Sequence, residues 1–214
     1  MKYSCYIFDL DGTLLYTLED LANSVNYAME QSHYPTHSID EVRNMVGNGV
    51  KVLIERAVPS GTSEEEALRA LSIFQQHYLI HNQDTTRPYE GIMEMLNALK
   101  QAGKKVAVVS NKFDKATKAL CDKYFPGLID IAVGENEAAG IRKKPYPDMV
   151  MEVMQELGVS ADESVYIGDS EVDIDTARNA SLPCITVLWG FREKDFLKEK
   201  GAKCFVTSPL EISD

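Results

Sequence analysis

Short apolar segments that alternate with helical patterns are the feature that most restricts the fold of this chain. In segments such as VAVV and CITVL the apolar residues stand at consecutive positions rather than at every second position. Strands with that pattern are covered on both faces, as in a parallel sheet. We expect six strands, at residues 3–8, 105–109, 129–133, 164–167, 184–188 and 203–206. Their alternation with helices predicts an α/β fold with a doubly wound parallel sheet.

One interval interrupts this alternation. Residues 15–87 show no strand pattern, and a plain loop of that length is uncommon inside a compact domain. The interval instead carries two apolar stripes at helical spacing. The first is Leu18, Leu21, Ala22, Val25 and Met29, with Thr17 as the expected N-cap, and the second is Ala67, Leu71, Phe74 and Tyr78.

We therefore predict a helical domain at residues 15–87, inserted into a core made of residues 1–14 and 88–214. The linkers are expected near residues 14–16 and 84–88. An extension of the helical layer of the sheet is the alternative interpretation of the same stripes. The predicted whole is an α/β protein whose Rossmann-like core carries an inserted α-helical cap domain.

The charge balance restricts the partners. The 214 residues include 33 acidic and 22 basic side chains, which gives a net charge of −11. Because a negative field repels phosphate backbones and anionic lipids, neither nucleic acid nor a membrane surface is an expected partner. The first residues do not form a signal peptide, and the four cysteines lack C-x-x-C spacing, so we expect reduced thiols and a cytoplasmic protein. The oligomeric state is not indicated by the sequence.

The segment DLDGTL, at the end of the first expected strand, is the strongest chemical signal. Asp9 and Asp11 are two residues apart, so in an extended chain both carboxylates project to the same side. Two such groups repel each other unless a cation compensates, and oxygen ligands favour Mg²⁺. An Asp-rich turn is the simpler alternative for this segment.

Further polar side chains follow other expected strands. Ser110 and Asn111 come after the second strand, Lys144 after the third, and Asp169 and Asp173 after the fourth. In open α/β sheets, ligands bind at the edge where the strands end. Taken singly, Ser110 is also explained as a helix N-cap, Lys144 as a surface charge, and the two acids as the start of a helix. Because all of these residues are expected at the same edge of the sheet, a shared site is the favoured interpretation.

The ordered segments DLDGTL, VVSNK, KKP and GDSEVD resemble the motifs of the haloacid dehalogenase superfamily. The resemblance spans the predicted core and implies a Rossmann-like sheet, a nucleophilic aspartate and a helical cap inserted after the first strand. Within the superfamily, VGNGVKVLIERA and WGFR are similar to segments of phosphoglycolate phosphatases. This implies a Mg²⁺-dependent phosphatase whose partner is a small phosphate ester, with 2-phosphoglycolate as the expected substrate.

The resemblance also implies a role for individual residues. Asp9 would attack phosphorus and become an aspartyl phosphate, while Asp11 would protonate the leaving alcohol and then activate water. Ser110 would bind the phosphoryl oxygens beside Asn111, and Lys144 would offset the negative charge.

The implied metal ligands are a second set. Mg²⁺ would be held by Asp9, by the main-chain carbonyl of Asp11 and by Asp169, with Asp173 in or near the second shell.

Within the expected cap, the segment from Gly47 to Arg56 is the candidate for substrate contact. Gly47 and Gly49 allow main-chain amides to approach an anion, and Lys51 and Arg56 add positive charge. The glycines are equally explained by a turn between two helices. His77 and His81, at a spacing suited to a metal, are interpreted as cap residues because no acidic motif supports them.

Two other functions remain as alternatives. A sugar phosphatase, a phosphomutase or a pyrophosphatase of the same superfamily would share the core motifs, because the cap decides the substrate. A phospho-receiver-like signalling or binding module, a different class, also uses paired acids, Ser or Thr, and Lys on a parallel sheet. It needs no inserted domain, and its acceptor aspartate follows a later strand than the acid pair.

Overall fold

The computed structural model describes residues 2–136, 138 and 140–213. It consists of two compact units: Met1–Leu15 with Pro88–Asp214, here called the core unit, and Tyr16–Arg87, here called the inserted unit. The chain crosses between them through two short strands, β2 (Leu15–Tyr16) and β3 (Arg87–Pro88), which pair with each other. Two residues are too few to produce a strand pattern, and the sequence did not predict this pair.

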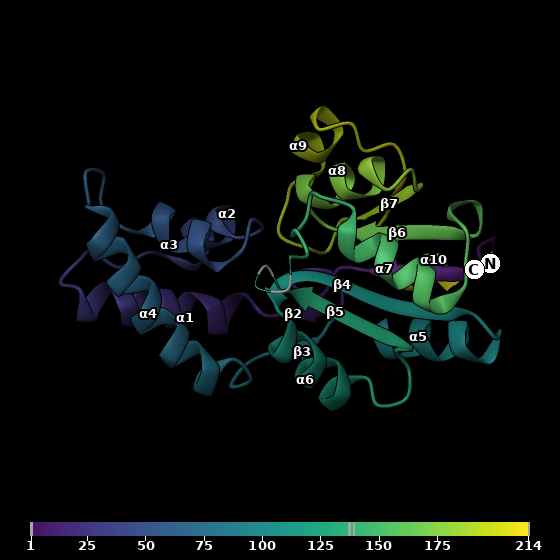
Figure 1. Ribbon diagram of the computed structural model, residues 1–214, viewed down its shortest axis with the longest axis horizontal. Helices are drawn as coiled ribbons and strands as arrows, with labels where there is room; N and C mark the ends of the chain where they lie inside the picture. Colours follow the sequence, from purple (N-terminus) through teal and green to yellow (C-terminus); the bar gives the residue numbers. More distant parts are fainter. Residues whose placement is uncertain (1, 137, 139, 214) are drawn as a thin grey trace. The chain divides into compact units, whose positions relative to one another are not determined.

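The core unit is built on a parallel sheet, as predicted (Figure 1). Six strands are arranged in the order β5-β4-β1-β6-β7-β8, and the strand pairs run parallel. Their bounds are β1 (Cys5–Phe8), β4 (Lys105–Phe113), β5 (Ile131–Glu135), β6 (Ser164–Gly168), β7 (Cys184–Val187) and β8 (Phe205–Val206). In β1, Phe8 is in register with Val108 of β4 and with Ile167 of β6, so β1 lies between the two strands.

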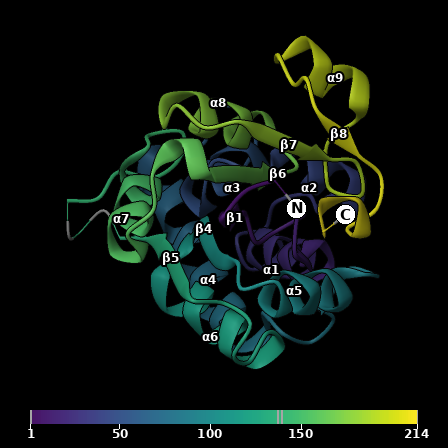
Figure 2. The same ribbon diagram turned by 90° about the vertical axis from the view of Figure 1, so that its right-hand side faces the viewer.

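Helices cover both faces of this sheet, which explains the consecutive apolar residues of its strands. Tyr6 and Phe8 of β1 pack into one cluster, and Cys5 and Ile7 pack into another. The first cluster contains residues of α5 (Ile92–Gln101), α6 (Asp114–Tyr124) and α10 (Leu210–Ser213). The second contains residues of α7 (Asp148–Leu157) and α8 (Glu171–Asn179), and Figure 2 shows α7 and α8 opposite α5 and α6.

Two short elements complete the core unit. The 3₁₀-helix η2 (Ala161–Glu163) leads into β6. Helix α9 (Lys194–Glu199) packs Leu197 into a small separate cluster with Ile174 of α8.

The inserted unit is helical and has buried apolar residues of its own. Its helices are α1 (Leu18–Gln31), α2 (Ile39–Met45), α3 (Val50–Ala57) and α4 (Glu64–His81). The stripe of α1 is buried as expected, and α4 contributes Phe74 and Tyr78, whose rings stack 5.3 Å apart. Thr17 is the N-cap residue of α1, as predicted, but its side chain makes no capping hydrogen bond, and its buried Oγ1 has no hydrogen-bond partner among the described residues.

Asp20 ties the first turn of α1 to the segment that returns to β3. Its carboxylate is buried and accepts hydrogen bonds from the main-chain N–H and hydroxyl of Thr85, at 2.9 and 2.7 Å. It also accepts from the N–H and hydroxyl of Thr86, at 3.0 and 2.8 Å. The beginning and the end of the inserted unit are therefore held together by one side chain.

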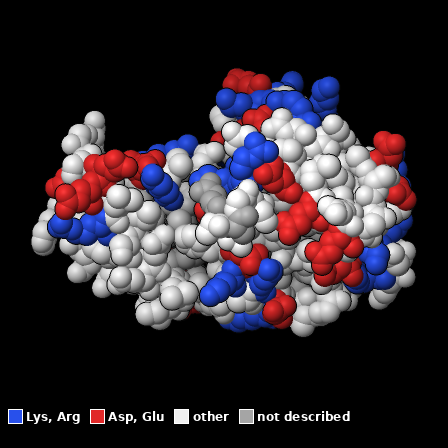
Figure 3. All heavy atoms as spheres, viewed as in Figure 1, with Lys and Arg blue, Asp and Glu red and all other residues white. Residues whose placement is uncertain are grey.

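Charged side chains of both signs lie on the surface of the protein (Figure 3). Acidic and basic side chains are interspersed on the face drawn in Figure 3, so the excess of acids is not gathered there into one patch. Across the described residues, none of the helices is long and apolar enough to cross a bilayer.

Candidate active site

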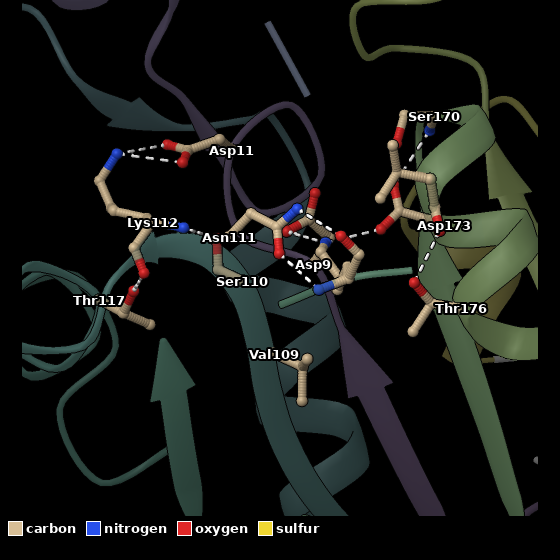
Figure 4. Close-up of polar contacts among 12 residues, drawn as sticks. Asp9, Asp11, Val109, Ser110, Asn111, Lys112, Thr117, Ser170, Asp173 and Thr176 are labelled. Atoms are coloured by element: carbon tan, nitrogen blue, oxygen red, sulfur yellow. Dashed lines mark hydrogen bonds and ion pairs between the residues drawn. The ribbon is translucent and has the colours of Figure 1, made fainter. Parts of the chain in front are cut away.

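The predicted site residues of the core unit lie where β1, β4 and β6 end (Figure 4). Asp9 directly follows β1, and its N–H donates to the carbonyl of Ile167 in β6 at 2.8 Å. Ser110 is buried near the end of β4, and Asp169 directly follows β6. Parallel strands bring their carboxyl ends to one edge, so the sheet itself assembles these side chains.

Lys144 joins two carboxylates in the interior of this site. Its ammonium lies 2.8 Å from Asp9 Oδ1 and 2.7 Å from Asp173 Oδ1. All three side chains are almost completely buried, with 2% of the Lys144 side chain exposed. The interpretation of Lys144 as a solvated surface charge is therefore excluded.

Asn111 fixes the main chain of Lys144. The amide of Asn111 donates to the Lys144 carbonyl at 3.1 Å and accepts from the Lys144 N–H at 2.8 Å. Asn111, expected beside the substrate, thus holds the loop that delivers the ammonium.

Asp173 is held from several directions. Its Oδ2 accepts from the N–H and hydroxyl of Ser170, at 3.1 and 2.6 Å, and the Tyr166 hydroxyl lies 3.2 Å from its Oδ1. Gly168 leaves room for it, since a Cβ there would collide with the Asp173 side chain. Both oxygens of Asp173 therefore have partners within the protein, which makes it chiefly an anchor for Lys144.

Asp169 occupies a space that glycines leave open. Its Oδ2 accepts a 2.6 Å hydrogen bond from the main-chain N–H of Phe191. A Cβ at Gly12 or at Gly190 would collide with the Asp169 carboxylate, and Gly12 has a positive φ of 87°. The glycine of DLDGTL and that of WGFR are thus both required for Asp169 to reach the site.

Burial is the largest cause of the shifts in the pKa values of Asp9 and Asp169. It raises the pKa of Asp9 to about 7; the positive charge of Lys144 opposes this shift, and the negative charges of Asp173 and Asp11 add to it. Burial, with Asp173 and Asp9 nearby, also raises the pKa of Asp169 well above its usual range. An added cation would favour the ionised forms of both groups.

The pKa of Lys144 is shifted by two opposing causes. Burial lowers it, but the charges of Asp173 and Asp9 outweigh burial and raise the pKa well above the usual range of lysine. Lys144 is therefore a permanent positive charge beside Asp9.

Asp11 lies apart from this group. Its carboxylate oxygens are 2.9 and 3.0 Å from the ammonium of Lys112, and Figure 4 shows the side chain turned toward Lys112 and away from Asp9. The expectation that the carboxylates of Asp9 and Asp11 face one space does not hold in this conformation. An alternating projection applies within a regular strand, whereas β1 ends at Phe8, so Asp9 and Asp11 both lie beyond it, in the segment that leads to the turn at Gly12.

The predicted cap residues belong to the inserted unit. Gly47 and Gly49, both with positive φ, lie between α2 and α3, so the turn between two helices is present. Arg56 donates to the Met45 carbonyl at 2.8 Å and to Asn48 Oδ1 at 3.0 Å, which fixes the shape of this turn. Lys51 is half exposed and lies 3.9 Å from Glu55.

Several residues that shape the site were not singled out from the sequence. They are Lys112, Tyr166, Ser170 and Phe191. Ser170 carried a signal, because Ser170 and Asp173 form a capping box at the start of α8. Tyr166 lies within an apolar strand, so its hydroxyl was not considered as a site group. Phe191 binds Asp169 through its main-chain N–H, a contact that the residue type does not indicate.

Chemically, the arrangement presents a buried carboxylate beside a fixed cation. Asp9, Asp169 and Asp173 each place one oxygen within 4.8 Å of the others, a spacing that a single metal ion can bridge. A nucleophile, a cation and hard oxygen ligands at the end of a parallel sheet suit reactions of anionic esters.

Comparison with known proteins agrees with this geometry. The family model of the haloacid dehalogenase-like hydrolases matches residues 6–187. The chain belongs to the haloacid dehalogenase-like hydrolase family. Its inserted unit follows β1 along the chain.

Relatives in this hydrolase family match most of the chain. The phosphoglycolate phosphatase of Aquifex aeolicus is 32% identical, covering 86% of this chain and 84% of the relative. That of Caulobacter vibrioides is 32% identical, covering 96% of this chain and 87% of the relative. A crystal structure of a protein from Lactobacillus delbrueckii subsp. bulgaricus superimposes with a TM-score of 0.95 at 39% identity, covering 100% of this chain and 98% of that one.

Proposed function

We propose that this chain is a Mg²⁺-dependent phosphatase that hydrolyses 2-phosphoglycolate to glycolate and phosphate through an aspartyl phosphate on Asp9. The relatives from Aquifex aeolicus and Caulobacter vibrioides bear the name phosphoglycolate phosphatase and match along most of their length. The observation that carries the proposal is the buried contact of 2.8 Å between Asp9 and Lys144. A carboxylate held beside a permanent cation is suited to approach an anionic ester.

In the first step, an oxygen of Asp9 attacks phosphorus and the bond from phosphorus to the bridging oxygen breaks. The leaving alkoxide takes a proton from Asp11 and departs as glycolate. Ser110, buried beside the end of β4, donates its hydroxyl hydrogen to a phosphoryl oxygen. Lys144 offsets the charge that gathers as two anions approach.

In the second step, water attacks the phosphorus of the aspartyl phosphate. Asp11, now ionised, accepts the proton of that water, and the bond between phosphorus and the Asp9 oxygen breaks. Phosphate leaves, the Asp9 carboxylate is restored, and Asp11 is protonated for the next turnover. The two steps divide one difficult hydrolysis into two easier transfers.

The residues present fit a magnesium ion. Asp9 and Asp169 are buried carboxylates with raised pKa values, and Lys144 contacts only one of these two, Asp9, so a further positive charge would stabilise the ionised pair. We assign the ion to Asp9, Asp169 and the main-chain carbonyl of Asp11, with Asp173 in the outer shell because Lys144 and Ser170 bind its oxygens. When bound, Mg²⁺ supplies a positive charge that polarises the phosphoryl group.

The inserted unit is proposed to act as the cap that selects the substrate. Arg56 fixes the shape of the turn that contains Gly47 and Gly49, glycines there would let the main-chain amides of the turn approach an anion closely, and Lys51 adds a positive charge. Amides and a lysine suit a small ester that bears a carboxylate.

A phosphate-release screen over a panel of phosphate esters tests the substrate. We expect 2-phosphoglycolate to show a higher kcat/KM than sugar phosphates, nucleotides and pyrophosphate. The matched control is the Asp9→Asn variant, which should release no phosphate from any of them. A hexose phosphate or pyrophosphate that exceeds 2-phosphoglycolate about tenfold would overturn the substrate and leave the phosphatase chemistry in place.

A further inference from the structure

The segment at residues 189–192, here called the WGFR segment, follows β7 and packs on the turn of DLDGTL. Trp189, the only tryptophan of the chain, donates its indole N–H to the main-chain carbonyl of Thr13 at 2.9 Å. Its partly buried ring packs against the apolar cluster on the α5 face of the sheet. The ring of Phe191 lies close to Gly12, since a Cβ on that glycine would be 2.9 Å from a carbon of the ring.

The other end of the WGFR segment is fixed as well. Arg192 Nε donates to the carboxylate of Glu171 at 3.1 Å, and both side chains are mostly buried. Glu171 is the first residue of α8, which follows Asp169. The segment therefore spans from the turn that follows β1 to the helix that follows β6. Those two places carry two of the proposed ligands of the magnesium ion, the carbonyl of Asp11 and the carboxylate of Asp169.

Between these two ends, the main chain of the WGFR segment determines how Asp169 can turn. The N–H of Phe191 donates to Asp169 Oδ2 at 2.6 Å, a short hydrogen bond of the kind that an ionised acceptor makes. Gly190 passes so close that a Cβ there would lie 2.5 Å from the same oxygen. Because this hydrogen bond engages Oδ2, the carboxylate offers a bound ion one oxygen, Oδ1. A shift of the segment would make both oxygens available.

The number of oxygens that Asp169 offers affects the choice of cation. Mg²⁺ requires near-octahedral geometry and takes few protein ligands, whereas Ca²⁺ takes more ligands and readily binds both oxygens of one carboxylate. A carboxylate that is held through Oδ2 therefore suits Mg²⁺ and disfavours Ca²⁺. A carboxylate that turns freely would lose this discrimination.

We propose that Trp189 is a positioning residue that gives the site its preference for Mg²⁺ over Ca²⁺. Its hydrogen bond to Thr13 keeps the WGFR segment on the turn of DLDGTL, and the segment in turn keeps Oδ2 of Asp169 engaged. Trp189 acts through Phe191 and supplies no ligand atom itself. The inference rests on the proposed function, which assigns Mg²⁺ to Asp169, and adds to it the origin of the cation preference.

Calorimetric titration of the metal-free chain with Mg²⁺ and with Ca²⁺ tests this role. Trp189→Phe keeps an aromatic ring and removes the N–H donor. The Kd for Mg²⁺ should rise about 3- to 10-fold, the range for one neutral hydrogen bond, while the Kd for Ca²⁺ changes less. The preference for Mg²⁺, expressed as the ratio of the two Kd values, should therefore fall.

The matched control is Ser164→Ala, at the opposite end of β6 from Asp169. It removes a hydrogen bond of the same kind, from the Ser164 hydroxyl to the Ser160 carbonyl at 2.8 Å. We expect this variant to lose stability and to keep the ratio of the wild type. A second variant carries benzothienylalanine in place of tryptophan, which exchanges the N–H for sulfur and keeps the shape of the ring. Because Trp189 is the only tryptophan, the exchange affects no other position, and it should lower the ratio as Trp189→Phe does.

Turnover provides an independent measurement. For Trp189→Phe, the Mg²⁺ concentration that gives half-maximal phosphate release should rise, while kcat at saturating Mg²⁺ stays within about twofold of the wild type. Equal losses of affinity for both cations, or an unchanged ratio in both Trp189 variants, would make Trp189 only structural and overturn the proposal. A wild-type chain that binds no Mg²⁺ would instead contradict the ion assignment of the proposed function.

Discussion

The side-chain amide of Asn111 and the main chain of Lys144 form a reciprocal pair of hydrogen bonds: the Lys144 N–H donates to Asn111 Oδ1 at 2.8 Å, and Asn111 Nδ2 donates to the Lys144 carbonyl at 3.1 Å. The contact joins the end of β4 to the loop before α7, and it delivers the ammonium of Lys144 between Asp9 and Asp173. The cation is therefore placed by the backbone as well as by its charge. Because the cation is already in place, little reorganisation is needed when the phosphoryl group arrives.

Removing that cation should destabilise the fold as well as the reaction. Lys144→Met leaves the carboxylates of Asp9 and Asp173 buried without their shared ammonium, so we expect a loss of about 3–5 kcal/mol in the free energy of unfolding, together with loss of turnover. Urea denaturation in metal-free buffer measures the stability. The double variant Lys144→Met with Asp173→Asn should recover part of it, whereas an unchanged midpoint for Lys144→Met would show that the pair carries little energy.

Asp9→Asn should abolish turnover and change the pH dependence of stability. Without the nucleophile, kcat should fall by at least about 10³-fold. Between its usual pKa of 3.8 and the folded value of about 7, Asp9 keeps a proton that the unfolded chain has lost. Its contribution to stability is therefore present below about pH 4 and is lost as the pH rises to about 7.

The Asp9→Asn variant has no carboxyl group at this position, so it lacks the decrease in stability that Asp9 causes between about pH 4 and pH 7. In chelator, the free energy of unfolding of Asp9→Asn should gain on that of the wild type as the pH rises over that interval. Urea denaturation at several pH values measures the difference. A constant difference across the interval would contradict the raised pKa, and turnover above about a tenth of wild type would remove Asp9 from the mechanism.

The sequence predicts the location of residues that directly follow the strands of the parallel sheet. Asp9 and Asp169 follow buried strands, and the order of a parallel sheet brings both to one edge, so their meeting could be predicted. The six strands of the sheet were located for the same reason, since their apolar runs reflect cover on both faces.

Other features depend on contacts that no local pattern encodes. Lys112, in the part of β4 where the register to β5 shifts, contacts Asp11 near the end of β1, and the main chain of Phe191 binds Asp169. The direction of the Asp11 side chain was missed because the alternation ends with β1 at Phe8, three residues before Asp11. These are relations between distant segments, and they appear only when the backbone is known.

Metal removal should stop the reaction and lower the melting temperature. Because Asp9 and Asp169 repel each other when ionised, Mg²⁺ should stabilise the folded chain as well as activate it. Ca²⁺, which prefers more ligands at longer distances, should bind without supporting turnover. Phosphate release and thermal melting, each with chelator and with either ion added back, measure the two effects. Full activity in chelator, with metal absence verified by elemental analysis, would contradict the assignment.

Asp20 should matter for the stability of the inserted unit. Asp20→Ala removes the acceptor for four donor groups, the N–H and the hydroxyl of both Thr85 and Thr86, so we expect a loss of about 3 kcal/mol in the free energy of unfolding. The neighbouring Glu19→Gln breaks a half-exposed pair with Arg87, 3.4 Å long, and should change stability by less than about 1 kcal/mol. Denaturation of both variants makes the comparison, and equal effects would refute the anchoring role.

Asp11→Asn should separate the roles of the two aspartates of DLDGTL. If Asp11 protonates the leaving oxygen, its loss should slow 2-phosphoglycolate by about 10²–10⁴-fold. The phosphorylation of Asp9 by p-nitrophenyl phosphate should be slowed far less, because that leaving group departs with little need of a proton. Burst kinetics isolate the phosphorylation step for each ester. Equal losses in that step would assign Asp11 to binding alone, since only an acid distinguishes esters by the basicity of the oxygen that leaves.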